Sequence, residues 1–219
     1  MSEKSSSPLA RRSFLTQVGT GVTVLGAGAA ITIPVATAQS LGGAPWQAAR
    51  HDQDDWLEKI PGKHRLVFDT TDPGRMSNAT LYAGNFYTAN QTGYGLQNAD
   101  LAVVIVARHN STAFAYNESI WEKYGDTLSN SIDRNKPPSK TNPNLRQLTT
   151  LTGRGMNIAV CLMATTRLAG MIATAANSTQ ADILTELSAN LLPNAHLVPA
   201  GIVAVGRAQE HGYALVHAV

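Results

Sequence analysis

The sequence predicts an α/β fold, a three-layer α/β sandwich around a mostly parallel sheet of about five strands. The clearest observation is Leu101–Ala107, a run of seven apolar residues. A strand without polar alternation is typical of one covered on both faces in a parallel sheet. The second observation is that short β-favouring runs alternate with segments of helical period, as in βαβ units with right-handed crossovers. The expected strands span residues 64–69, 101–107, 157–161, 195–198 and 213–216.

The first strand and helix are bounded by turn and breaker residues. His64–Asp69 favours a strand and stops at Thr71-Asp72-Pro73-Gly74, a turn signal. The next segment, from Met76 to about Asn90, has apolar and small residues at helical spacing, and Gly93 and Gly95 follow as C-terminal breakers. We therefore expect one strand and one helix before the central strand.

The middle of the chain predicts a short helix and then a long loop. Apolar residues three and four apart indicate an amphipathic helix over Asn117–Tyr124, closed by Gly125. Residues 125–144 are polar, contain prolines and show no periodicity. A loop of that length in a compact domain is a lid, an assembly surface or a disordered segment.

The second half repeats the alternation of helices and strands. Cys161 is the last residue of one expected strand, and Pro199 precedes the last expected helix. The expected helices span residues 145–154, about 165–176, about 180–192, and 201–210.

The N-terminus has the features of an export signal. Arg11-Arg12-Ser13-Phe14-Leu15 resembles the twin-arginine motif, a weakly apolar run follows over Val18–Ile33, and Ala36-Thr37-Ala38 is a small-residue cleavage site. We predict a signal peptide over 1–38, the twin-arginine translocon as a partner during export, a periplasmic location, and no stable membrane span after cleavage. An uncleaved anchor and a general secretory signal are the alternatives. An N-terminal arm over 39–62 and an α/β domain over 63–219 complete the predicted organisation.

The charge of the mature chain is balanced. Lys4, Arg11, Arg12 and Glu3 lie in the first 38 residues, which leaves 14 basic and 14 acidic side chains beyond them. A neutral body has no long-range attraction for phosphate backbones, and no basic cluster with interleaved aromatic residues is present. We therefore predict no nucleic-acid partner.

Neither a metal nor a nucleotide cofactor is predicted. The histidines are scattered, without Cys-x-x-Cys or His-Glu-x-x-His spacing. The glycines of Thr152-Gly153-Arg154-Gly155 precede a strand rather than a phosphate-facing helix, so they indicate the end of a helix.

Three residues at strand ends are the candidate site. Arg108 and His109 follow the central strand, and Cys161 ends the next one. In parallel sheets, sites gather at the carboxyl ends of the strands, so these side chains are expected at one edge. A helix N-terminus and nearby cations favour a reactive thiolate, whereas the alternative is a small core cysteine. For Arg108 the alternative is an ion pair with a residue such as Asp69 or Glu118.

Six runs carry a resemblance to a known family: Lys63–Arg65, Arg108–His109, Ala113–Ala115, Trp121–Tyr124, Met156–Cys161 and Val198–Ala214. With these runs, the chain over about residues 60 to 219 resembles the DsrE/DsrF-like sulfur-relay superfamily. The resemblance implies an α/β sandwich that assembles as dimers, trimers or hexamers, in which a strand-end cysteine carries persulfide sulfur. Cys161 alone matches that cysteine, and the chain has no second cysteine for a relay.

The functional expectation is an exported DsrE-like protein that carries sulfur on Cys161. Arg108 and His109 would stabilise a thiolate or a small anionic sulfur ligand. The alternative is a non-catalytic, oligomeric binding or scaffold protein with a structural cysteine. Thiol reactivity separates the two hypotheses.

Overall fold

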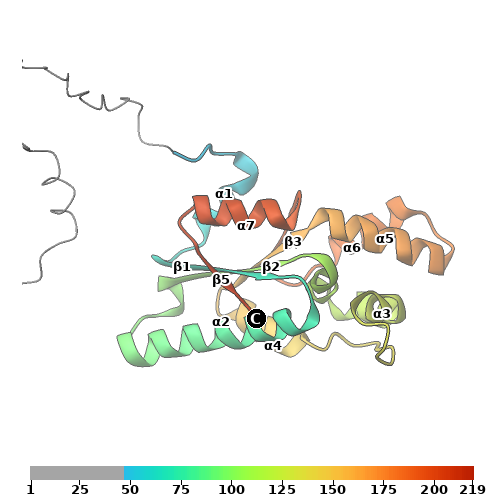
Figure 1. The fold of residues 1–219 in the computed structure, drawn as a ribbon, viewed down its shortest axis with the longest axis horizontal. Coiled ribbons are helices and arrows are strands. Elements are labelled where there is room, and N and C mark those ends of the chain that lie inside the picture. Colours follow the sequence, from blue (N-terminus) through green and yellow to red (C-terminus); the bar gives the residue numbers. More distant parts are fainter. Residues whose placement is uncertain (1–46) are drawn as a thin grey trace, which may run out of the picture. The chain divides into compact units, whose positions relative to one another are not determined.

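The computed structural model describes residues 47–219, and the predicted signal peptide lies outside the described residues. Within this part, one compact unit contains strands and helices in alternation (Figure 1). Its strands are β1 His64–Thr70, β2 Leu101–Ala107, β3 Asn157–Cys161, β4 Ala195–Val198 and β5 Ala214–His217. Its α-helices are α1 Asp55–Lys59, α2 Pro73–Tyr94, α3 Glu118–Ile132, α4 Leu145–Gly153, α5 Leu162–Ala176, α6 Gln180–Ala189 and α7 Gly201–Glu210, and short 3-10 helices span Asp52–Asp54, Asn98–Asp100 and His109–Ala115.

The sheet confirms the predicted α/β fold class. Its five strands run in the order β4-β3-β2-β1-β5, and every neighbouring pair is parallel. All seven residues of β2 are buried, as the unbroken apolar run predicts for the middle strand. The carboxyl ends of all five strands therefore lie along one edge, which is where a site in a parallel sheet is expected.

Alternate residues of the strands enter two separate apolar layers. Phe68 and Ile105 belong to a large core with residues of α2, α3, α4, α5 and α6. Val67 and Val106 face the opposite way, into a smaller core with residues of α1 and α7. Figure 1 shows α1 and α7 on one side of the sheet and α2 and α4 on the other, so the fold is a three-layer sandwich.

Helix α2 begins earlier than the sequence prediction because the turn signal is also its N-terminal cap. The Asp72 carboxylate accepts a hydrogen bond from the Arg75 backbone N–H at 3.0 Å, and Pro73 occupies the first helical position. Both are standard features of a helix start. Gly95 ends the helix in the left-handed conformation, with φ of 69°, as a C-terminal glycine commonly does.

The prediction that Gly125 closes a short helix is wrong. Helix α3 continues to Ile132, and the loop that follows spans only residues 133–144. This loop packs against α3: the Ser129 hydroxyl accepts a hydrogen bond from the Ser139 N–H at 2.8 Å. A side chain at position 125 would collide with the loop backbone at Ser139 and Lys140. Gly125 is therefore a glycine required by packing inside the helix. From the sequence alone, such a glycine looks the same as one that ends a helix.

Smaller differences concern the other helix ends. Helix α5 begins at Leu162 rather than near Thr165, and α6 ends at Ala189 rather than Leu192. The earlier start of α5 makes Cys161 its N-cap residue. Cys161 consequently lies closer to the helix N-terminus than the sequence prediction placed it.

The described part of the predicted arm packs on the smaller core. Leu57 and Ile60 are buried, and the Tyr213 hydroxyl donates a hydrogen bond to the Leu57 carbonyl oxygen at 2.8 Å. The Trp56 ring stacks on His196 with centroids 4.2 Å apart. In residues 47–219, no helix is long and apolar enough to cross a membrane.

The stack between Trp56 and His196 predicts that stability falls in mild acid. Burial lowers the pKa of His196 below its ordinary value of 6.5. His196 therefore binds a proton more readily in the unfolded chain than in the folded one. The contribution of the neutral ring to the free energy of unfolding is complete above pH 6.5 and is lost as the pH falls below that value. We expect the free energy of unfolding, measured with urea, to fall less between pH 7.5 and pH 5 in His196→Phe than in the wild type. Equal losses in both proteins would contradict this role.

Candidate functional site

The sheet brings Arg108 and Cys161 to the same point of its carboxyl edge. Strands β2 and β3 are paired up to Ala107 and Val160, so the next residue on each strand is one of the two candidates. Two residues earlier, Val106 and Ala159 both face the smaller core. Because strand side chains alternate with a period of two, Arg108 and Cys161 are directed to that same face.

Arg108 forms a bidentate ion pair with Asp69 of β1. Its Nε and Nη2 donate to the two carboxylate oxygens at 2.7 and 2.8 Å, and the two side chains are 19% and 11% exposed. The hydrogen bonds to Asp69 raise the pKa of Arg108. Of the two ion-pair partners that the sequence analysis named, Asp69 is confirmed. Because the pair is nearly buried and doubly hydrogen-bonded, it fixes the guanidinium in one orientation.

His109 is placed by a sharp change of direction after β2. Its φ of 53° lies in the left-handed region, which is uncommon for a residue with a side chain. A buried serine holds the turn: the Ser111 hydroxyl contacts the carbonyl oxygens of Thr70 and Arg108, each at 2.8 Å. The turn leaves the His109 side chain exposed to solvent beside the strand ends. Unusual backbone conformations of this kind, held in place by hydrogen bonds, are more frequent at functional sites than elsewhere.

Cys161 joins β3 directly to α5. It is 7% exposed, and its carbonyl oxygen accepts a hydrogen bond from the Thr165 hydroxyl at 3.0 Å. Thr165 in turn accepts one from the buried Tyr116 hydroxyl at 2.9 Å. The backbone around the cysteine is therefore rigid, and the small exposed part of the residue faces a pocket.

A pocket of about 260 Å³ gathers all three predicted site residues. Arg108, His109 and Cys161 line it together with Arg167 of α5. No acidic residue is among its lining residues, which also include Met163, Ala164, Ala200, Gly201 and Ile202. Asp69 compensates the charge of Arg108 from behind, so Arg167, which has no carboxylate partner among the described residues, gives the pocket its net positive charge and suits it to a small anion.

Two helix N-termini also border this pocket. Helix α5 starts after Cys161, and α7 starts at Gly201 after Ala200, and neither cap residue provides a side-chain hydrogen bond. Unsatisfied N–H groups and the helix dipole favour a negative charge at these positions. Gly201 is required for the close approach, because a Cβ there would lie 2.5 Å from the Cβ of Arg108.

Arg167 and Gly201 are site residues that were not predicted from the sequence. Arg167 lies one helical turn beyond Met163 and Ala164 on α5, and all three line the pocket. That α5 carries this face to the end of β2 depends on packing. The Pro199-Ala200-Gly201 run was a visible signal for the beginning of α7, but its contact with Arg108 depends on the arrangement of strands and helices.

Potential metal ligands do not cluster in the described part of the chain. Within residues 47–219, no group of three or more His, Cys, Asp and Glu side chains is close enough together to hold a metal ion. The chemistry that this pocket offers comes from a thiol, an imidazole and two guanidinium groups.

The fold and site thus define an α/β protein with a cationic, cysteine-containing pocket at the carboxyl edge of a parallel sheet. No protein-family model matches the sequence, and a comparison with curated proteins also gave no match. Among solved structures, the chain is similar to a protein of unknown function from Methanobacterium thermoautotrophicum. The two are 16% identical with a TM-score of 0.39, and the alignment covers 71% of this chain and 99% of the other.

Proposed function

We propose that this protein is an exported, DsrE-like sulfur carrier that holds persulfide sulfur on Cys161. The observation that supports the proposal most directly is that Cys161, His109 and Arg167 line one pocket with Arg108, and that Arg167 has no carboxylate partner among the described residues. A persulfide is an anion at neutral pH, and positive charge with helix N-termini around it would stabilise that anion.

The transfer would be an exchange between sulfur atoms. The Cys161 thiolate attacks the outer sulfur of a donor persulfide, a new S–S bond forms at Cys161, and the S–S bond of the donor breaks. The inner sulfur of the donor leaves as a thiolate and takes up one proton. The exposed His109 ring is a suitable source of that proton. The total oxidation state is unchanged, so no external oxidant or reductant is needed.

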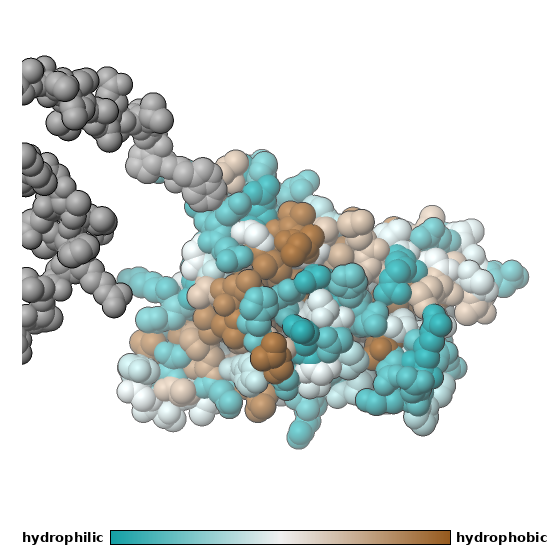
Figure 2. Space-filling model, in the orientation of Figure 1, coloured by the Kyte–Doolittle hydropathy of each residue, from teal (hydrophilic) through white to brown (hydrophobic). Residues whose placement is uncertain are grey.

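A homo-oligomer is part of the same proposal. Five exposed apolar side chains lie at or near the pocket: Leu162, Met163, Leu197, Ile202 and Val203. Figure 2 shows apolar surface over α7 that continues over β5. Contiguous exposed apolar surface is typical of protein–protein contact sites, which supports assembly through this side of the molecule. Light scattering coupled to gel filtration measures the number of subunits.

The second candidate is a non-catalytic binding or scaffold protein. The bidentate bond to Asp69 and the near-complete burial of Cys161 favour it, because both features also fit a purely structural role. In that case the pocket would hold a small anion, or nothing, and the cysteine would not react.

The deciding experiment is to offer a low-molecular-weight persulfide to the native protein and to measure its intact mass. We expect Cys161 to gain one sulfur atom, the gain to be absent in Cys161→Ser, and its rate to fall about tenfold in Arg167→Ala, since the anion loses a cationic partner. Arg134→Ala is the matched control, because Arg134 is also exposed but is not part of the pocket.

A non-catalytic binding or scaffold protein would give a different result in the same experiment. A thiol reagent would label Cys161 only after denaturation, and no sulfur would be gained by the native protein. That outcome would overturn the sulfur-carrier proposal and leave the binding or scaffold function.

A further inference from the structure

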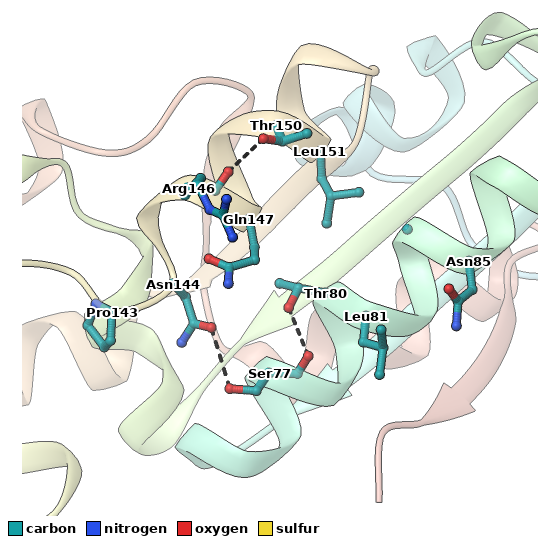
Figure 3. A pocket seen from close by; sticks show the side chains of 11 residues that line it. Ser77, Thr80, Leu81, Asn85, Pro143, Asn144, Arg146, Gln147, Thr150 and Leu151 are labelled. Carbon is teal, nitrogen blue, oxygen red and sulfur yellow. Dashed lines mark hydrogen bonds between the residues drawn. The ribbon is translucent and has the colours of Figure 1, made fainter.

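A second hollow lies on the opposite side of the sheet from the cysteine pocket. Figure 3 shows its lining residues, which lie on and between α2 and α4. Its volume is about 590 Å³. This volume is in the range of sites for small organic molecules. We call it the α2–α4 groove, and its lining residues are Ser77, Thr80, Leu81, Gly84, Asn85, Pro143, Asn144, Arg146, Gln147, Thr150 and Leu151.

The groove is built by helical spacing. Ser77, Leu81 and Asn85 are four residues apart on α2 and therefore share one face of that helix. Arg146 and Thr150 have the same spacing on α4 and form the opposite wall. Its floor consists of the buried residues Thr80, Asn144 and Leu151. The two walls are regular helices, so the groove is a fixed feature of the fold.

Its polar side chains are largely uncommitted. The side chains of Asn85, Arg146 and Gln147 make no hydrogen bond or ion pair with any other described residue. Asn144 accepts a hydrogen bond from the Ser77 hydroxyl at 3.4 Å, while its amide nitrogen has no acceptor among residues 47–219. Figure 3 shows Gln147 directed from α4 toward α2. Three carboxamides and one guanidinium thus offer donors to the groove.

The composition of the walls limits the class of ligand. No lining residue is acidic, and Arg146 is the one lining residue with a full charge. A guanidinium binds a carboxylate through two parallel hydrogen bonds. Carboxamides both donate and accept, so they pair with hydroxyl groups. Leu81, which is 58% exposed, provides apolar surface for a carbon backbone.

We propose that the α2–α4 groove binds a small hydroxylated carboxylate of the sugar-acid class. Arg146 holds the carboxylate, and Asn85, Asn144 and Gln147 bind the hydroxyl groups. The site is separate from the cysteine pocket and shares no lining residue with it. The proposal is therefore independent of sulfur chemistry at Cys161.

Gly84 allows a direct test of the groove. It lines the hollow, and a Cβ built at this position has no atom within 4 Å. Gly84→Leu should therefore fill the groove without disturbing α2. Gly93→Leu is the matched control on the same helix, because its Cβ also meets nothing within 4 Å and it does not line the groove.

The experiment is a calorimetric titration of the full chain with D-gluconate, with D-glucose as the uncharged comparison. We expect saturable binding of gluconate, weakened about tenfold in Arg146→Ala and abolished in Gly84→Leu. The controls Arg134→Ala and Gly93→Leu should bind as the wild type does. No saturable binding to the wild type, equal binding in Arg146→Ala and Arg134→Ala, or equal binding of glucose would overturn the proposal.

Discussion

Asp69→Asn is expected to lower the free energy of unfolding by about 2–4 kcal/mol. Replacement of the carboxylate leaves the Arg108 guanidinium, only 19% exposed, without an anionic partner at the edge of the sheet. Removal of one partner from a partly buried ion pair lowers stability by far more than the intact pair adds to it, because the remaining charge stays desolvated. Urea unfolding followed by tryptophan fluorescence measures the change.

The matched control is the exposed pair of Lys140 and Asp126. These groups are 2.8 Å apart, but their side chains are 52% and 59% exposed. Asp126→Asn should therefore change stability by less than about 0.5 kcal/mol. Adding Arg108→Met to Asp69→Asn should restore part of the loss, since it removes the unpaired charge. Similar effects of Asp69→Asn and Asp126→Asn would show that the first pair is not held in a desolvated environment.

Gly125→Ala is expected to destabilise the protein by about 2–3 kcal/mol, a large effect for one added methyl group. The new Cβ would collide with the Ser139 carbonyl oxygen and lie 2.9 Å from the Lys140 Cα. These atoms are backbone, so the loop over residues 133–144 must move away from α3 as a whole. Increased proteolysis within this loop, together with reduced resistance to urea, is the expected result.

Gly84→Ala is the control variant, and it is expected to raise the free energy of unfolding rather than lower it. Position 84 lies inside α2 and has open space around a Cβ. Alanine favours a helix interior over glycine, so this variant should gain about 0.5–1 kcal/mol. If Gly125→Ala were also neutral or stabilising, the loop would not pack against α3 as described.

The fold class was predictable because the central strand carries an unbroken apolar run and β-favouring segments alternate with helical ones. Leu101–Ala107 is typical of a doubly covered strand, and it is the middle strand of the sheet. The helix lengths were less predictable. Gly125 has the composition signal of a breaker, yet it lies inside α3 because the returning loop leaves no room for a side chain. The residues next to Gly125 in the sequence give no information about the loop that packs against it in the fold.

The candidate site was also partly predictable. Strand ends placed Arg108, His109 and Cys161 on one edge, and the structure brings them into one pocket. Arg167 was not predicted, because its place in the pocket depends on how α5 packs against the end of β2 and the start of α7. The α2–α4 groove had no counterpart in the sequence analysis, because its walls become neighbours only when α2 and α4 pack on the same face of the sheet.

The sequence by itself determined which residues end the strands, because the alternation of side chains along a strand and the signals that end it come from residues close together in the chain. Only the tertiary structure decided what those residues meet there. Asp69 rather than Glu118 pairs with Arg108 because β1 lies next to β2 in the sheet. The partners of a charged group depend on elements that are far apart in sequence, and packing selects them only after the layers assemble.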